Sequence, residues 1–255
     1  MSNFQKYSAF YDLLYRDKDY AAEAAYVAQT IRKAIPHART ILELGSGTGR
    51  HGRLLAAMGF DVHGIERSPE MVFFARAASC PPCSETDGSF SCEVGDICTA
   101  HLGRTFDAVI SLFHVMSYQT TNQSLQAAFQ VATDHLKPGG LFLFDVWHGP
   151  AVLSQGPSER VKEVADERYR VKRTARPELD TNRSTVKVVY QMNCEDLMSG
   201  ENVQFSEEHL MRYVFPTEVD LLAQNCGLRK VMTEEFLTGE PSSPSTWSVI
   251  YGLQR

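Results

Sequence analysis

A glycine-rich segment near the start of the chain has the composition of a loop that holds a ligand. It reads Glu-Leu-Gly-Ser-Gly-Thr-Gly from Glu43 to Gly49 and follows the short apolar run Thr40–Leu44. Glycines let the backbone turn tightly and approach a ligand closely. The helix predicted after the loop would present free amide groups, and in an open parallel sheet this is the crevice in which ligands bind. The segment therefore predicts a cofactor loop.

Two kinds of cofactor fit this loop. Residues 47–52 form a literal G-x-G-x-x-G, and Glu66 lies where a ribose-binding carboxylate is found, so a dinucleotide has to be considered. Against it, Glu43 would lie close to a pyrophosphate, whereas it suits a cationic cofactor that carries an amine and a sulfonium. Asp96 and Ile97 follow the third predicted strand, where the carboxylate can accept from an adenine amino group. These residues favour the cationic cofactor.

Two histidines follow predicted strands and are candidates for acid–base chemistry. His114 and Tyr118 lie in the segment after the fourth strand, and His148 follows the fifth. An unperturbed imidazole titrates near neutral pH, so each histidine can serve as a general base. The alternative for His114 is a hydrogen-bonded histidine that shapes the pocket. His148 is the weaker candidate, because Gly149-Pro150 predicts a turn directly after it. Phe113 and Trp147 are candidate walls of an acceptor pocket.

Composition describes a globular chain with no bias toward polyanions. Its 255 residues are 43% hydrophobic and carry a net charge of −6, which disfavours a nucleic-acid partner. The N-terminus lacks the pattern of a signal peptide, and no run approaches the roughly 18 apolar residues that span a membrane. We therefore expect a cytoplasmic protein with reduced cysteines and no membrane partner. Four cysteines cluster, but only the first pair has zinc-site spacing, so no metal is expected: Cys80, Cys83, Cys92 and Cys98.

Strands and helices alternate through the first part of the chain. This order predicts an α/β fold with a Rossmann-like, seven-stranded, mostly parallel sheet that has helices on both faces. The predicted strands cover residues 40–44, 60–65, 91–94, 106–112 and 141–145. The predicted helices cover residues 20–35, 50–58 and 122–136, and a further helix starts at Ser68-Pro69. The helix at residues 122–136 should end at Lys137-Pro-Gly-Gly140.

The pattern changes near residue 158. Strand-like stretches at 160–174, 184–193 and 203–214, separated by polar turns, predict an inserted antiparallel meander. A helix at 217–224 and strands at 229–237 and 247–253 then close the core. We therefore expect an N-terminal helical cap, a cofactor-binding core, a meander that covers the active site, and the closing elements, at residues 1–36, 37–157, 158–214 and 215–255.

Taken together, residues 40–146 resemble the class I S-adenosylmethionine-dependent methyltransferases. The resemblance rests on the glycine loop, the acidic end of the second strand at Gly64-Ile-Glu66, Gly95-Asp96, the fourth strand and Leu136-Lys-Pro-Gly-Gly140. It implies S-adenosyl-L-methionine as cofactor, with Glu43 and the loop on its methionine part, Glu66 on the ribose hydroxyls, and Asp96 and Ile97 on adenine. The full set that it implies is Glu43, Gly45, Ser46, Gly47, Gly49, Glu66, Arg67, Met71, Asp96, Ile97 and Leu112.

The N-terminal residues carry a narrower resemblance. Residues 7–15 and 18–23 are similar to the start of N-methyltransferases that modify dTDP-linked amino sugars, and of methyltransferases from surface-polysaccharide clusters. This resemblance implies that Tyr11 and Tyr15 contact the acceptor or close over the cofactor, whereas an amphipathic helix would use them as core. A meander in such enzymes often joins subunits, so a homodimer is an option.

The sequence therefore predicts methyl transfer to a nitrogen or oxygen of a small molecule, such as a nucleotide-linked sugar or a capsule precursor. Two alternatives remain open from the residues alone. One is an NAD(P)-dependent reductase that uses the literal G-x-G-x-x-G of residues 47–52. The other is a non-catalytic relative that binds the cofactor or a partner protein.

Overall fold

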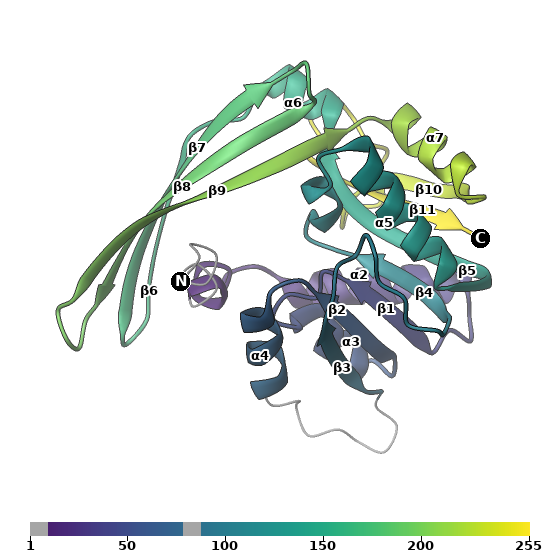
Figure 1. Ribbon diagram of the computed structural model, residues 1–255, viewed down its shortest axis with the longest axis horizontal. Helices are drawn as coiled ribbons and strands as arrows, with labels where there is room; N and C mark the ends of the chain where they lie inside the picture. Colours follow the sequence, from purple (N-terminus) through teal and green to yellow (C-terminus); the bar gives the residue numbers. More distant parts are fainter. Residues whose placement is uncertain (1–9, 79–87) are drawn as a thin grey trace. The chain divides into compact units, whose positions relative to one another are not determined.

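The computed structural model describes residues 10–78 and 88–255 (Figure 1). The chain divides into two compact units. Of the described residues, the core unit comprises 19–78, 88–154 and 213–255, and the strand unit comprises 10–18 and 155–212. No helix in the described ranges is long and apolar enough to cross a membrane.

The core unit is built on a mixed sheet. Strands β1 to β5 are parallel, β11 pairs antiparallel with β5, and β10 pairs antiparallel with β11. The order along the sheet is β3-β2-β1-β4-β5-β11-β10, so the central β1 has a parallel neighbour on each side. The bounds are β1 Thr40–Leu44, β2 Asp61–Glu66, β3 Phe90–Val94, β4 Phe106–Ser111, β5 Leu136–His148, β10 Arg229–Glu235 and β11 Ser248–Gln254.

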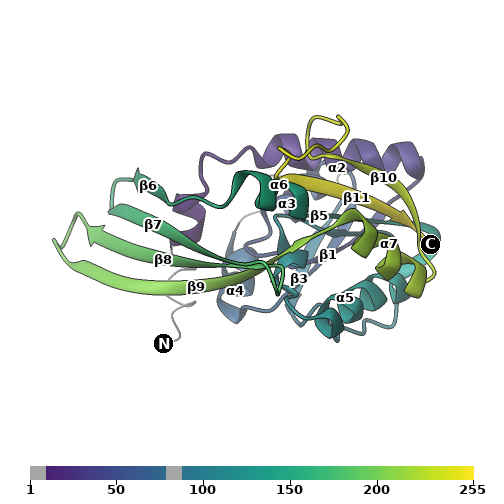
Figure 2. The same cartoon turned by 90° about the horizontal axis from the view of Figure 1, so that it is seen from above.

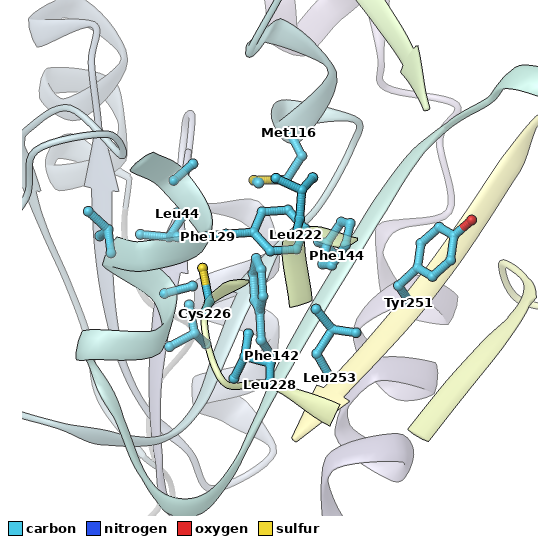
Figure 3. Close-up of a cluster of buried hydrophobic side chains, with 14 of the residues drawn as sticks. Leu44, Met116, Phe129, Phe142, Phe144, Leu222, Cys226, Leu228, Tyr251 and Leu253 are labelled. Atoms are coloured by element: carbon cyan, nitrogen blue, oxygen red, sulfur yellow. The ribbon is translucent and has the colours of Figure 1, made fainter. Parts of the chain in front are cut away.

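Helices cover both faces of this sheet (Figure 2). On one face, Ala24 and Ile31 of α2 and Leu55 of α3 pack against alternate strand residues such as Ile41. On the other face, Phe129 of α5 and Leu222 of α7 pack against Phe142 and Phe144 of β5, as Figure 3 shows. The α/β prediction is therefore confirmed. The helices are α2 Tyr20–Ala34, α3 Arg50–Ala57, α4 Pro69–Ala77, α5 Asn122–Asp134, α6 Gly149–Gln155 and α7 Pro216–Asn225.

Local chemistry explains where two of these helices begin and end. The Ser68 hydroxyl accepts from the Met71 amide and Pro69 opens α4, as the sequence predicts. Helix α7 ends before Gly227, whose φ of 68° is the left-handed conformation that stops a helix.

Two predicted boundaries differ from the structure. Helix α5 does end before Lys137-Pro-Gly-Gly140, but these residues lie inside β5, because the backbone there pairs with the end of the chain: Arg255 N donates to Gly140 O at 3.0 Å. Strand β7 continues beyond the predicted end at residue 174 and includes Pro177. Pairing between β6 and β7 ends at Ala175, so Pro177 has a neighbouring strand on one side only, and an edge position tolerates a residue without an amide proton. Helix α6 was not predicted.

The strand unit is the predicted antiparallel meander. Its strands β6 Arg160–Ala165, β7 Tyr169–Asp180, β8 Thr185–Asp196 and β9 Asn202–Val214 pair in sequence order. One face is apolar where Leu14, from the helical residues 10–14, packs against Val171, Met192 and Cys194. The last two residues of β9 belong to the core unit, where they pair with Trp147 and His148 of β5.

Residues 10–36 do not form the single cap expected over residues 1–36, of which residues 1–9 lie outside the described residues. Helix α2 belongs to the core unit, and residues 10–18 belong to the strand unit. The boundary lies at Asp19, which caps α2 by accepting from Ala22 N. Just before it, Arg16 donates to Ala165 O and Lys162 pairs with Asp17, which fixes this part of the chain to β6.

Candidate active site

The glycine loop is held at the carboxyl end of β1 by the neighbouring strand. The amides of Gly45 and Ser46 both donate to Ile65 O of β2, at 2.8 and 3.0 Å. Gly45, Gly47 and Gly49 all have positive φ, a conformation that glycine adopts without strain. A Cβ on Gly45 would lie 2.5 Å from Val115, the residue after His114. The loop and the segment that carries His114 are therefore in direct contact.

Gly47 is the position at which the loop is open. An added Cβ would meet only Met71 Sδ, at 3.8 Å, among the described residues within 4 Å. This space fits the methionine part of the cofactor that the sequence predicts, and a side chain there would fill it. Met71 itself is buried and borders the same space.

Glu66 lies at the end of β2 and is bound by the loop backbone. It accepts from Gly47 N at 2.9 Å and from Ser68 N at 2.8 Å. Burial raises its pKa, and the amides lower it again by stabilising the carboxylate. A carboxylate has about four acceptor positions, so the two amides leave room for ribose hydroxyls.

Glu43 is buried almost completely at the end of β1. Its Oε2 has no hydrogen-bond partner among the residues that the structure describes. Burial, reinforced by the nearby Glu66 carboxylate, raises the pKa of Glu43 to about 8. A buried carboxyl group without a partner is costly, and an ammonium group would relieve it. The cationic methionine part of S-adenosylmethionine fits this position.

Gly52 has a packing role. A Cβ at this position would lie 2.3 Å from the ring of Phe90 and 2.8 Å from Glu43 Oε2. Gly49 is restricted in the same way by Phe90, at 2.5 Å. The glycines that complete the literal G-x-G-x-x-G therefore serve contacts within the protein, and the dinucleotide alternative loses its main support.

His51 and Glu23 are two residues near Glu43 that the sequence did not single out. His51 Nε2 is hydrogen-bonded to Glu23 Oε2 at 2.7 Å, and both residues are buried. His51 Nδ1 lies 3.9 Å from Glu43 Oε1, and the Tyr20 ring lies 4.9 Å from the imidazole. The pair therefore links α2 to the cofactor loop. The sequence held one clue to this arrangement: the i, i+3 spacing of Tyr20 and Glu23 puts both side chains on one face of the helix.

The remaining predicted cofactor residues are more scattered. Asp96 follows β3, is exposed, and accepts from Cys98 N at 2.8 Å. Ile97 is buried in the apolar cluster that includes Leu44. Arg67 is exposed, and Leu112 is buried in the cluster beneath α2 and α3.

His114 forms a pair with a carboxylate that the sequence analysis did not choose. Its Nδ1 lies 2.7 Å from Asp145 Oδ2, and its amide donates to Asp145 Oδ1 at 3.1 Å. Asp145 is buried at the end of the apolar core of β5. Phe113 and His114 have φ of 65° and 61°, which is strained for residues with side chains. Such strain occurs where the surrounding structure holds a functional group in place.

The aromatic candidates lie beside this pair. The Trp147 ring is 6.2 Å from that of His114, and its amide donates to Ser117 Oγ. Tyr118 is 45% exposed. His148 is buried and bonded through Nδ1 to Thr246 O at 3.2 Å, and burial lowers its pKa. The bond to Thr246 O fixes the segment before β11.

Tyr11 and Tyr15 belong to the strand unit. Their rings lie 4.8 Å apart, and Arg173 donates to the Tyr15 hydroxyl at 2.9 Å. Among the cysteines, Cys80 and Cys83 lie outside the described residues. Cys92 is buried against α4, and Cys98 Sγ lies 3.1 Å from Gln119 Oε1. The described part of the chain holds no group of residues with the makeup of a metal site.

Comparisons with known proteins place the chain among methyltransferases. A family model described as a methyltransferase domain matches residues 41–140. A curated relative from Streptomyces venezuelae, the dTDP-3-amino-3,4,6-trideoxy-alpha-D-glucopyranose N,N-dimethyltransferase, is 31% identical over 91% of this chain and 92% of its own length. The crystal structure of S. venezuelae DesVI is 27% identical with a TM-score of 0.79, covering 96% of this chain and 97% of that one. The structure of S-adenosylmethionine-bound CalS10, an amino pentose methyltransferase from Micromonospora echinaspora, is 28% identical with a TM-score of 0.74. The match covers 100% of this chain and 98% of that one.

Proposed function

The chain belongs to the class I S-adenosylmethionine-dependent methyltransferases, and we propose that it methylates the amino nitrogen of a nucleotide-linked amino sugar. The reaction uses S-adenosylmethionine as methyl donor. Membership of this family favours methyl transfer over the reductase and the non-catalytic alternatives. The amino-sugar acceptor is supported by the printed function of the 31% identical relative and by the amino pentose methyltransferase among the structural neighbours.

The geometry that carries the proposal is the His114–Asp145 pair next to the glycine loop. An amino sugar arrives largely as an ammonium ion at neutral pH, so a base has to remove a proton before the nitrogen can act as a nucleophile. With Nδ1 directed to Asp145, His114 can accept that proton at Nε2. The buried Asp145 holds the ring in this orientation.

When bound, S-adenosylmethionine would supply an electrophilic methyl group on a positively charged sulfur. Glu43 would bind the methionine ammonium, Glu66 the ribose hydroxyls, and Asp96 and Ile97 the adenine. Gly45, Ser46, Gly47 and Gly49 would follow the methionine part, with Arg67, Met71 and Leu112 completing the surroundings. Holding donor and acceptor in line supplies much of the rate enhancement.

The other candidate residues receive roles around the acceptor. Phe113 and Trp147 would form walls beside His114, and Tyr118 would contact the acceptor. His148 would act as a positioning residue through its bond to Thr246 O. The strand unit would contribute acceptor recognition, with Tyr11 and Tyr15 as its aromatic groups.

We further propose a cytoplasmic homodimer whose cofactor-binding sheet is the seven-stranded β3-β2-β1-β4-β5-β11-β10 arrangement. Free cysteines at positions 92, 98, 194 and 226 suit a reducing compartment. Strand β6 is an edge of the meander and offers main-chain groups for pairing. Light scattering on the purified protein tests the dimer.

The test of the acceptor is a methyl-transfer assay with dTDP-linked amino sugars, read as the mass of the product. We expect one or two added methyl groups on the amine. His114→Ala should lower turnover on the order of a hundredfold, with unchanged affinity for S-adenosylhomocysteine. His37→Ala, an exposed histidine elsewhere in the core unit, serves as the control. A wild-type enzyme that binds S-adenosylhomocysteine but methylates only hydroxyl acceptors would contradict the proposal.

A further inference from the structure

Ser117 carries a buried hydroxyl in the core unit that the proposed mechanism does not use. It lies in the short 3-10 helix η1 Val115–Tyr118, which begins directly after His114. Its exposed fraction is 0%, so the side chain is shielded completely from solvent. Burying a hydroxyl costs free energy unless it forms hydrogen bonds, and the bonds of Ser117 therefore indicate what it does.

Two hydrogen bonds connect Ser117 to the turn before it and to strand β5. Its amide donates to His114 O at 3.0 Å. Its Oγ accepts from the amide of Trp147 at 3.2 Å, and Trp147 lies two residues after Asp145 in β5. Ser117 therefore ties the backbone of the proposed base to the strand that carries its partner carboxylate.

These bonds close a ring around the His114–Asp145 pair. The His114 amide donates to Asp145 Oδ1 at 3.1 Å, and the His114 carbonyl accepts from Ser117. Both backbone polar groups of His114 are thus held, one by the carboxylate and the other by η1. From Ser117 the ring returns to β5 at Trp147.

The ring lies where β5 changes its neighbour within the core unit. The pairing of β4 with β5 ends at Phe144, and the pairing of β9 with β5 begins at Trp147. Asp145 lies in the interval between these two pairings. The turn that carries His114 and Ser117 supplies polar contacts to β5 in this interval.

The turn needs such support because its backbone is strained. Phe113 and His114 have φ of 65° and 61°, and residues with side chains keep this conformation only where the surroundings hold them in it. An alanine at position 117 would keep the amide bond to His114 O. It would remove the bond to Trp147, and with it one of the attachments of the turn to β5.

We infer that Ser117 is a positioning residue that holds the His114 imidazole against Asp145. This inference rests on the proposed role of His114 as the base. The Ser117 side chain is buried and its Oγ is bound to the Trp147 amide, so it acts through His114 and not on the acceptor. The proton of the acceptor ammonium goes to His114 Nε2, and Ser117 neither gains nor loses one.

Support of the cofactor loop is a competing role for Ser117. Helix η1 starts at Val115, and a Cβ on Gly45 of the loop would lie 2.5 Å from its side chain. Lost support for the loop would weaken the binding of S-adenosylhomocysteine. A displaced imidazole would instead lower turnover at unchanged affinity for S-adenosylhomocysteine, so two separate measurements distinguish the roles.

Nuclear magnetic resonance of the imidazole tests the positioning without any methyl acceptor. Long-range proton–nitrogen spectra of isotope-labelled histidine report which ring nitrogen carries the proton, and His114→Ala identifies the signals of residue 114. In alkaline buffer, where a histidine is neutral, the wild type should show the Nδ1–H form that Asp145 favours. In Ser117→Ala we expect a mixture of both forms. Thr133→Val, which removes a buried hydroxyl from α5, should keep the wild-type spectrum.

Turnover with an amino-sugar acceptor is the second measurement. In Ser117→Ala, kcat should fall about tenfold, whereas the affinity for S-adenosylhomocysteine should not change. Ser117→Thr retains a hydroxyl and should restore both the Nδ1–H form and the turnover. If the alanine or the threonine protein does not fold, Ser117→Cys replaces it, because a thiol fills a similar volume but accepts hydrogen bonds weakly. The cysteine protein should then behave as expected for alanine.

The outcomes separate this inference from the proposed function. An unchanged ring form and unchanged turnover in Ser117→Ala would overturn the inference and leave the proposed function intact. A loss of affinity for S-adenosylhomocysteine equal to the loss of turnover would also overturn it, because Ser117 would then support the cofactor loop. A wild-type protein that shows the Nδ1–H form but does not methylate amino sugars would contradict the proposed function, and a changed ring form in Ser117→Ala would still support the positioning of the imidazole.

Discussion

Glu66 in the core unit and Glu207 in the strand unit are buried carboxyl groups with different surroundings. Glu66 lies in a loop at a strand end, where the amides of Gly47 and Ser68 point at it. Glu207 lies in the middle of a strand, where the amides are used in the sheet, and the polar group next to it is the imidazole of His209, at 3.4 Å. A strand end can therefore stabilise an ion with its own backbone, whereas a sheet face depends on side chains or a ligand.

This difference separates the expected effects of substitution. Changes at the carboxyl ends of β1 and β2 should alter affinity for S-adenosylhomocysteine, whereas Glu207→Leu in the strand unit should leave that affinity unchanged and preserve or raise the melting temperature. Three substitutions in the core unit test the first half of the comparison, and Glu207→Leu tests the second.

The largest effect is expected for Gly47→Val. The valine side chain would enter the open space beside Met71, and the backbone would be strained at a φ of 54°. Affinity for S-adenosylhomocysteine, measured by calorimetry, should fall by about 3 kcal/mol, on the order of a hundredfold. Gly103→Val is the matched control, because Gly103 also has a positive φ and faces open space away from the loop. Equal losses in both variants would show that the strain, and not the lost space, matters.

An intermediate effect on affinity is expected when the pH is raised toward the pKa of Glu43. Its pKa of about 8 means that the empty site is protonated at neutral pH, whereas a bound ammonium favours the carboxylate. Binding must then release a proton, so affinity should rise by up to about tenfold per pH unit until about pH 8. In Glu43→Gln the rise should be absent between pH 6 and 8.

The same shift has a consequence for folding. A carboxyl group whose pKa is raised in the folded state destabilises that state progressively as the pH climbs from its usual pKa to the raised one. Glu43→Gln should therefore gain stability relative to the wild type at pH 8 compared with pH 5, measured by urea unfolding. An identical pH profile for the two proteins would show that Glu43 ionises normally.

The smallest effect is expected for Glu23→Gln. The substitution weakens the bond that orients His51 toward Glu43, and affinity for S-adenosylhomocysteine should fall by about 1 kcal/mol. Glu234→Gln is a matched control, since Glu234 accepts from Tyr26 on the same helix α2 without touching the loop. If both variants weaken binding equally, the effect reflects the placement of α2 and not the imidazole.

Features that depend on neighbouring residues could be predicted from the sequence. The bounds of β1 and the cap of α4 at Ser68 follow from a few adjacent residues, and the glycine loop follows from its spacing. The closing elements from α7 to β11 were also predicted, because turn residues separate them clearly.

Features that depend on residues far apart in the sequence could not be predicted from it. The extension of β5 through Gly140 requires the partner Arg255 at the other end of the chain. Asp145 reads as the last residue of an apolar strand until His114 is seen 2.7 Å away. Glu23 and Glu207 are single acids in a helix and a strand, and only the fold shows that they are buried next to histidines.

Phe113 and His114, the two residues with positive φ before Val115, limit what selection for stability alone can achieve. Phe113 and His114 each cost about 1–3 kcal/mol in this conformation, and glycine would remove that cost. Glycine at position 113 should therefore yield a more heat-resistant protein, whereas glycine at position 114 also removes the imidazole that faces the buried Asp145, and this loss opposes the gain. Directed evolution that rewards only survival of heating would therefore accept glycine at 113 more readily than at 114.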